Sequence, residues 1–230
     1  MMINSNVVGI VADDLTGAND TALQFQLKGA NTQILLDEEV VPVNLKSTQT
    51  WAISTESRNI EPEAAYEKTK SAVRFLKENI NPDYYYKKID STVRGNIAVE
   101  VLAMLEALEM DASIIIPAFP AEGRVTVGGY HLLRGVPIER TEMARDPHSP
   151  IFESHLPTLL KSQLSDENKD LVASIELKTV MKGAGPILMQ LKELISAGKK
   201  IIVVDAVSTV DIEQIVLAIG KTDFNILPVG

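Results

Sequence analysis

Short runs of apolar residues alternate along most of the chain with longer stretches in which apolar residues recur at helical spacing. The apolar runs predict strands at residues 7–12, 32–36, 50–54, 84–89, 113–116, 171–175, 201–205 and 225–227. The helical stretches predict helices at residues 17–28, 62–78, 96–108, 185–196 and 210–219. Strands and helices that alternate in this way predict an open, mostly parallel sheet with helices on both faces.

Residues 120–150 interrupt this alternation. Several glycines and prolines punctuate the stretch, and it contains no helical pattern. Residues 130–133 and 136–138 flank a turn and predict a small hairpin. A stretch of this length without regular structure is usually functional or disordered, and its arginines and histidines favour function. The sequence therefore predicts one α/β, Rossmann-like domain over residues 1–230, with a hairpin and loop insertion around 120–150.

The composition fits a globular domain and excludes several classes of function. The 230 residues are 45% hydrophobic, which is enough for a full core, and their net charge is −9. This charge argues against a general nucleic-acid or acidic-membrane binder. The chain has no cysteine, so disulfides and thiolate chemistry are excluded. No apolar run is long enough to cross a membrane, and residues 1–6 lack a signal-peptide pattern. We expect a cytoplasmic protein.

Two adjacent acids, Asp13 and Asp14, directly follow the first predicted strand. Ligands of open α/β sheets bind at this edge, beyond the carboxyl ends of the strands. A carboxylate there can orient or deprotonate a substrate hydroxyl, or bind magnesium through water. The alternative is helix capping by Asp14 or Thr16. Because one acid is enough for a cap, the pair predicts catalytic residues, and which of the two acts as the base stays open.

A second polar loop follows the strand at 84–89 and precedes the next helix. Its candidate substrate-binding residues are Lys88, Asp90, Ser91, Arg94 and Gly95. The N-terminus of a helix attracts anions, and Arg94 can hold a carboxylate through two hydrogen bonds. The alternative is an Asp90–Arg94 salt bridge with Ser91 as the helix cap. Both polar loops follow strands of one parallel sheet, so we expect them to share a site.

The insertion contributes further candidates. Arg124 follows the strand at 113–116, and Gly128 with Gly129 either lets a backbone approach a ligand closely or simply forms a tight turn. Arg145 is a candidate as well, although beside Asp146 it can also be part of a surface pair of little energetic weight. The unevenly spaced histidines form no metal-binding motif, and there is no glycine-rich loop for nucleotide phosphates.

Four blocks of sequence together resemble the four-carbon acid sugar kinase family. They are GIVADDLTGANDTA, KKIDSTVRGN, PAFPAEGRVTVGGYHLL and TEMARDP. They stand in the family's order, and the resemblance extends from about residue 7 to residue 230. It implies the N-terminal, sugar-acid-binding domain of a two-domain kinase. Such a kinase uses ATP to phosphorylate the terminal hydroxyl of threonate, erythronate or 3-oxo-tetronate.

The resemblance also implies roles for the candidate residues. Lys88 and Arg94 suit the carboxylate of the sugar acid, and the aspartates suit its hydroxyls. Arg124 and Arg145 would meet the substrate or the transferred phosphate. ATP and Mg²⁺ would bind a C-terminal domain of the same protein, so we expect this chain alone to bind no cofactor or metal and to be inactive.

Partners and alternative functions complete these expectations. A homodimer is compatible with the sequence, whereas nucleic-acid and membrane partners are not expected. One alternative function is a non-catalytic domain that binds a small carboxylate. The other is a phosphatase with Asp13 as its nucleophile.

Overall fold

Eight strands form the central sheet of the computed structural model, which describes residues 6–38 and 45–230. They are parallel, and their order is β2-β3-β1-β4-β11-β5-β10-β9. The strands are β1 (Val8–Ala12), β2 (Thr32–Leu35), β3 (Thr50–Ser54), β4 (Tyr84–Lys88), β5 (Ala112–Ile115), β9 (Val172–Ile175), β10 (Ile201–Val204) and β11 (Ile226–Val229). The predicted fold class is confirmed, while residues 1–5, where a signal peptide would begin, lie outside the described residues.

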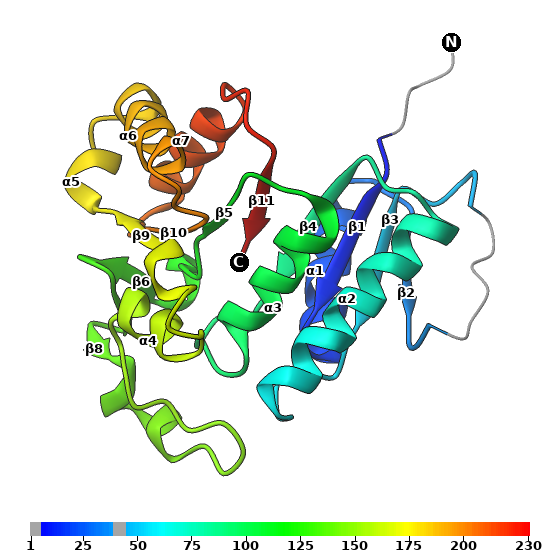
Figure 1. Ribbon diagram of the computed structural model, residues 1–230, viewed down its shortest axis with the longest axis horizontal. Coiled ribbons are helices and arrows are strands. Elements are labelled where there is room, and N and C mark those ends of the chain that lie inside the picture. Colours follow the sequence, from blue (N-terminus) through cyan, green and yellow to red (C-terminus); the bar gives the residue numbers. More distant parts are fainter. Residues whose placement is uncertain (1–5, 39–44) are drawn as a thin grey trace.

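Helices cover both faces of this sheet. They are α1 (Leu15–Leu27), α2 (Pro62–Asn79), α3 (Ile97–Leu108), α4 (Leu156–Ser162), α5 (Leu177–Val180), α6 (Ala184–Ser196) and α7 (Thr209–Ile219). Helices α2, α3 and α4 share one core cluster on the face nearer the viewer in Figure 1. Helix α1 covers β1 and β3 on the opposite face, where α6 and α7 cover the β10 side. The predicted helices are present, whereas α4 and α5 were not predicted.

Strands such as β1 and β10 have almost unbroken runs of apolar residues and glycine because they are buried on both sides. In β10, Ile201 and Val203 contact the core shared with α2 and α3, and Ile202 and Val204 contact the core under α6 and α7. This alternation follows from the geometry of a strand, in which successive side chains point to opposite faces. The backbone of the sheet therefore separates the two core clusters.

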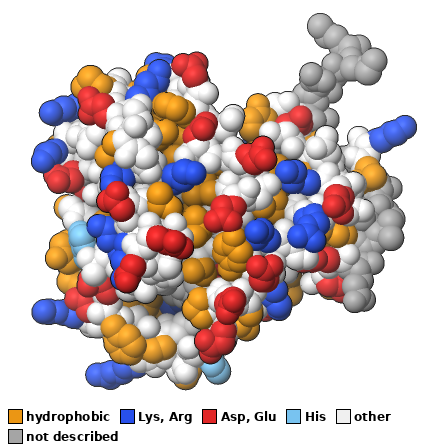
Figure 2. Space-filling model, viewed as in Figure 1, with side chains coloured by type: hydrophobic (Ala, Val, Ile, Leu, Met, Phe, Trp, Pro, Cys, Tyr) orange, Lys and Arg blue, Asp and Glu red, His pale blue; other side chains and the backbone are white. Residues whose placement is uncertain are grey.

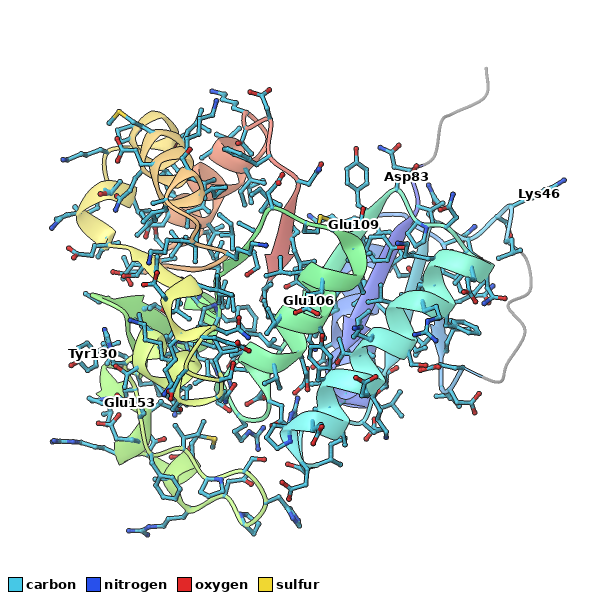
Figure 3. The ribbon with its side chains drawn as sticks, in the orientation of Figure 1. Lys46, Asp83, Glu106, Glu109, Tyr130 and Glu153 are labelled. Carbon is cyan, nitrogen blue, oxygen red and sulfur yellow. The ribbon has the colours of Figure 1, made fainter. Side chains whose placement is uncertain are left out.

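The insertion contains a small antiparallel sheet with the order β6-β7-β8. Its strands are β6 (Arg124–Val127), β7 (Tyr130–Leu133) and β8 (Val136–Pro137), and the 3₁₀ turns of the chain are η1 (Pro120–Glu122), η2 (Ile138–Arg140), η3 (Glu142–Arg145) and η4 (Lys169–Leu171). The predicted hairpin is β7–β8, and the third strand, β6, was not predicted. In Figure 3, Tyr130 and Glu153 lie near each other on the outer side of the insertion.

The register of the central strands aligns the loops that follow them. Ala12, the last residue of β1, lies opposite both Ser54 of β3 and Lys88 of β4. The loops after these three strands therefore begin at the same level of one sheet edge. Asp83 before β4 and Glu109 after α3 lie at the opposite edge (Figure 3), so they belong to a different surface.

The surface over α2, α3 and α4 mixes charges of both signs. Figure 2 shows acidic and basic side chains interspersed there with apolar ones. Within residues 6–38 and 45–230, no helix has the length and apolar character that crossing a membrane requires.

Candidate functional site

Arg58 lies between the two aspartates that follow β1. Its Nε donates to Asp13 Oδ2 at 2.7 Å, and its Nη1 lies 2.6 Å from Asp14 Oδ2. Asp14 is also the N-cap of α1, because its Oδ1 accepts the Gly17 N–H at 2.7 Å. The capping alternative thus holds for Asp14, but its other oxygen contacts Arg58. One guanidinium joins the loop after β3 to the loop after β1 through charge-assisted contacts.

A second ion-pair group follows β4. Arg94 contacts both oxygens of Asp90, with Nε at 2.8 Å and Nη2 at 3.1 Å. Its Nη1 donates to Asp146 Oδ2 at 2.8 Å. Arg58 Nη2 lies 3.8 Å from Asp90 Oδ1, so the two groups form one network. The Asp90–Arg94 salt bridge is therefore present, but the cap position of α3 belongs to Asn96 rather than Ser91.

This network favours the ionised form of its carboxylates. Burial alone would raise the pKa of Asp90, but hydrogen bonds from Arg94 and Thr92 outweigh it and hold that pKa well below its usual value. Backbone N–H groups of Ser149 and His148, with Arg94, lower the pKa of Asp146 to about 2. Both aspartates therefore act as acceptors at neutral pH.

A pocket of about 240 Å³ lies among these groups. It is lined by Asp14, Thr16, Gly17, Asp20, Arg58, Lys88, Asp90, Ser91 and Arg94. Lys88 reaches it beside α1, where a Cβ on Gly17 would lie 3.3 Å from Lys88 Cγ. Burial lowers the pKa of Lys88, and the charges of Asp13 and Asp90 partly offset this effect. The pocket offers carboxylates that accept hydrogen bonds next to cations that attract an anion.

A buried ion pair anchors the loop that carries Arg58. Lys87 Nζ lies 2.6 Å from Glu100 Oε2 of α3, and both side chains are almost wholly buried. Ser57 Oγ donates to the other Glu100 oxygen at 2.7 Å, and Thr55 Oγ1 donates to the Ala12 carbonyl at 2.9 Å. Burial raises the pKa of Glu100, an effect partly offset by the charge of Lys87. These contacts fix the backbone from which Arg58 projects.

The loop after β4 has an unusual backbone. Val93 has a φ of 59°, although a β-branched residue rarely adopts the left-handed region. Gly95 has a φ of 89°, and a Cβ there would lie 3.2 Å from Arg58 Cα. Gly95 thus lets the start of α3 approach the Arg58 backbone, and it does not line the pocket. Strained residues of this kind cluster at ligand sites.

The insertion reaches the pocket through His131 and Asp146. His131 is fully buried, with Nε2 3.0 Å from the Ser91 carbonyl and Nδ1 3.1 Å from Thr126 Oγ1. Burial lowers the pKa of His131. Because a carbonyl only accepts, Nε2 carries the proton and Nδ1 accepts from Thr126. The Ser91 backbone is therefore tied to β6 and β7.

The structure separates the remaining candidates from this pocket. Gly128 and Gly129 form the turn between β6 and β7, and both of their N–H groups donate to the buried Asp205, at 2.6 and 2.9 Å. The turn alternative explains these two glycines. Arg145 is exposed on η3, and its neighbour Asp146 makes the contact with Arg94.

Arg124 lines a second, larger groove next to the pocket. This groove of about 670 Å³ shares Asp20, Lys88 and Ser91 with the pocket. The Nε of Arg124 is buried and has no hydrogen-bond partner within the described parts of the chain. Arg124 therefore lies beside the pocket rather than in it.

Sequence reasoning missed Arg58 and undervalued Asp146. Arg58 follows β3 at the same sheet edge as the two predicted loops. The predicted strand at 50–54 could therefore have indicated that the loop after it also contributes to the site. Asp146 is 52 positions from Arg94 in the sequence, and only the fold of the insertion brings them together. Among residues 6–38 and 45–230, no group of three His, Asp or Glu side chains is placed to hold a metal ion.

Comparison with known proteins identifies the family of this chain. Residues 8–230 match the family described as "Sugar-binding N-terminal domain". A D-erythronate kinase of Heliobacterium modesticaldum is 39% identical over 92% of this chain and 47% of its own length. A D-threonate kinase of Salmonella typhimurium is 36% identical over 91% and 48%, and a 3-oxo-tetronate kinase of Haemophilus influenzae is 32% identical over 97% and 53%. The chain thus spans about half the length of these relatives.

A solved structure from Bordetella bronchiseptica has the same fold. It is described as a domain of unknown function with bound citrate, in a domain-swapped dimer. Its TM-score with this chain is 0.79 at 32% identity, over 97% of this chain and 53% of that one. The chain therefore belongs to the family of sugar-binding N-terminal domains that these four-carbon acid sugar kinases contain.

Proposed function

We propose that this chain binds a four-carbon sugar acid in the pocket between the loops after β1, β3 and β4 and presents its terminal hydroxyl for phosphorylation. The observation that carries the proposal is the alternation of Asp14, Arg58, Asp90, Arg94 and Lys88 around a pocket of about 240 Å³. A sugar acid has one carboxylate and several hydroxyls, so it needs both cations and acceptors. The names of the relatives support this substrate class, and citrate in the Bordetella structure also combines carboxylates with a hydroxyl.

The carboxylate of the sugar acid is assigned to Arg94. A guanidinium has five N–H donors, and the carboxylates of Asp90 and Asp146 engage Arg94 through three of them. The others remain for a ligand. Lys88 also lines the pocket, and its Nζ donates to the Ile89 carbonyl and carries further hydrogens for another oxygen of the ligand.

The terminal hydroxyl is assigned to Asp14. The Asp14 side chain is 21% exposed and lines the pocket, whereas the Asp13 side chain is 5% exposed and does not. Asp14 can orient the hydroxyl and accept its proton as the new bond to phosphorus forms. Asp13 then acts through Arg58, as a positioning residue. This assignment chooses between the two acids that the sequence left open.

ATP and Mg²⁺ are assigned to another part of the protein, where ATP would supply the phosphoryl group. The sequence has no glycine-rich phosphate loop, and the carboxylates of the pocket are engaged by arginines rather than grouped for a metal. The length of the relatives leaves room for such a part. A homodimer and a cytoplasmic location stay predictions.

The phosphatase alternative has less support than the kinase assignment. A nucleophilic aspartate must touch the phosphorus of its substrate. Asp13 is 4% exposed, and one of its oxygens accepts from Arg58. A purely binding role for a small carboxylate needs the cations of the pocket, whereas its acidic lining of Asp14, Asp20 and Asp90 favours a ligand that also has hydroxyls.

Calorimetric titration of the chain with D-erythronate and D-threonate tests the binding site. We expect R94A to weaken binding by about 2–4 kcal/mol, the scale for removing one partner of a buried charge pair. The matched control is R140Q, which removes an insertion arginine whose side chain is 77% exposed. Unchanged affinity in a folded R94A protein would refute the assignment of Arg94.

Phosphoryl transfer by the full-length protein tests the catalytic assignment. With ATP and the acid that binds best, we expect D14N to lose turnover while it retains affinity for the acid. An enzyme that binds the acid but transfers no phosphate would favour the non-catalytic alternative. Equal turnover in D14N and the unaltered protein would remove Asp14 from the mechanism.

A further inference from the structure

The cations around the pocket divide into two kinds. Arg58 and Arg94 each contact two carboxylates closely, at 2.6–2.8 Å. Lys88 and Arg124 have no carboxylate oxygen within 4.0 Å in the described parts of the chain. Lys88 Nζ donates only to the neighbouring Ile89 carbonyl, and Arg124 Nε has no partner at all among these residues. Lys88 and Arg124 are therefore partly buried cations without a carboxylate in ion-pair contact, although the charges of Asp13 and Asp90 act on Lys88 from farther away.

Both of these cations line the groove of about 670 Å³ between α1 and the insertion. Lys88 enters it from the end of β4 and Arg124 from β6. Ser91 adds a hydroxyl, and Asp20, exposed on α1, is the carboxylate that lines it. The groove opens from the sugar-acid pocket, because Asp20, Lys88 and Ser91 line both. A ligand that lies in the pocket can thus extend into the groove.

Burial of a cation without an anion is unfavourable, and a bound anion relieves it. A carboxylate has one negative charge, whereas a phosphate ester has nearly two and three acceptor oxygens. Two cations and a hydroxyl therefore match a phosphate better than a second carboxylate. The planar guanidinium of Arg124 suits two phosphate oxygens at once. The carboxylate of the same ligand would remain near Arg94, on the pocket side of Lys88.

We propose that Lys88 and Arg124 bind the phosphate group of the phosphorylated sugar acid in the groove between α1 and β6. The inference rests on the proposed function, and it locates the reacting end of the substrate. It also gives Arg124 a role separate from that of Arg94. Arg124 recognises the phosphate end and Arg94 the carboxylate end of one molecule.

Calorimetry on the chain with three probes tests this site. The probes are D-erythronate, D-erythronate phosphorylated on its terminal hydroxyl, and inorganic phosphate. We expect the phosphorylated acid to bind about tenfold or more tightly than the unphosphorylated acid. R124Q should abolish this difference and leave D-erythronate affinity unchanged. K88Q should reduce it as well, and the R140Q control should preserve it. If R124Q does not fold, as judged by circular dichroism, K88Q decides the question.

The outcomes separate this inference from the proposed function. Equal affinity for both forms of the acid, or a difference that survives in R124Q and K88Q, overturns the phosphate site. If D-erythronate fails to bind but inorganic phosphate binds and loses affinity in R124Q, the phosphate site stands and the sugar-acid assignment fails. ATP, titrated as a fourth probe, must not depend on Arg124 more strongly than the phosphorylated acid does. If it does, the groove serves the nucleotide instead.

Discussion

At the scale of single residues, Arg58 is the centre of the site. Its guanidinium contacts Asp13, Asp14 and Asp90 from the loops after β1 and β4. Burial alone would lower the pKa of Arg58, but Asp13 and the other aspartates outweigh it and raise the pKa. Arg58 is thus the cation that these three carboxylates share. The site depends on this side chain for its shape as well as its charge.

We expect R58Q to destabilise the protein by about 3–5 kcal/mol, because it leaves the buried Asp13 carboxylate without its cation. Denaturation in urea measures the free energy of unfolding. The control is R74Q, at an exposed position of α2. A free energy of unfolding for R58Q equal to that of the control would show that solvent replaces the guanidinium.

Asp90 should make stability depend on pH. Its pKa lies below the ordinary value of 3.8, so the folded state binds this proton less readily than the unfolded state does. Its contribution is therefore complete above about pH 5 and is lost progressively as the pH falls through 3.8 toward the lower pKa of the folded state. We expect the free energy of unfolding to fall between about pH 5 and pH 3 and to fall less steeply in D90N. Parallel pH profiles for both proteins would contradict this assignment.

At the scale of elements, the close approach of the start of α3 to the backbone of Arg58 requires a glycine at position 95. We expect G95A to cost about 1–3 kcal/mol of stability because its backbone is left-handed and its Cβ would crowd Arg58. G198A is the matched control, with a φ of 83° and no atom within 4 Å of the added Cβ. It should cost only the backbone penalty of about 1–2 kcal/mol.

A binding measurement distinguishes the two glycine variants further. G95A should also weaken sugar-acid binding, since it displaces Arg58, whereas G198A should bind as the unaltered chain does. Equal losses of stability and affinity in both variants would mean that the approach of α3 to Arg58 does not matter.

Strand positions could be predicted from the sequence because both faces of the sheet are buried. Residues 201–204 are Ile-Ile-Val-Val, and such an unbroken β-branched run predicts a buried strand. The end of β11 was harder to predict, because Pro228 lacks an N–H. The strand nevertheless pairs fully with β5, and it meets β4 only at Val229. Strand β6 was missed although it pairs with β7 across the two-residue turn Gly128–Gly129. Its further bridge, from Thr126 to Ala206, joins it to a distant loop that local pattern does not reveal.

The candidate site could be predicted in part, for a similar reason. Asp14 and Arg94 stand at strand ends, and their place at one sheet edge follows from parallel topology. The partner of each charged side chain does not follow from this topology. Asp146 and Arg58 meet their partners through tertiary contacts. The Gly128–Gly129 turn donates to Asp205, which lies in another loop. Sequence pattern indicates which edge binds a ligand, and packing decides which side chains remain for it.

At the scale of the whole molecule, one continuous sheet predicts one cooperative unit. The single tryptophan, Trp51, is buried in β3 near one edge of the sheet, and its fluorescence reports on that side. Far-ultraviolet circular dichroism reports on all helices. We expect both signals to give the same midpoint and slope in urea. An earlier fluorescence transition would divide the chain into two domains and overturn the single-domain prediction.

The place of β11 in the sheet has a consequence for the order of assembly. This strand comes last among the strands along the sequence, yet it lies in the middle, between β4 and β5. Until residues 226–229 join, the segment with Asp14, Arg58 and Arg94 shares no sheet hydrogen bonds with the segment that leads to Arg124. A growing chain therefore exposes two unpaired strand edges, which are prone to pair with other chains. The residues of the proposed ligand site come together only when β11 joins β4 to β5.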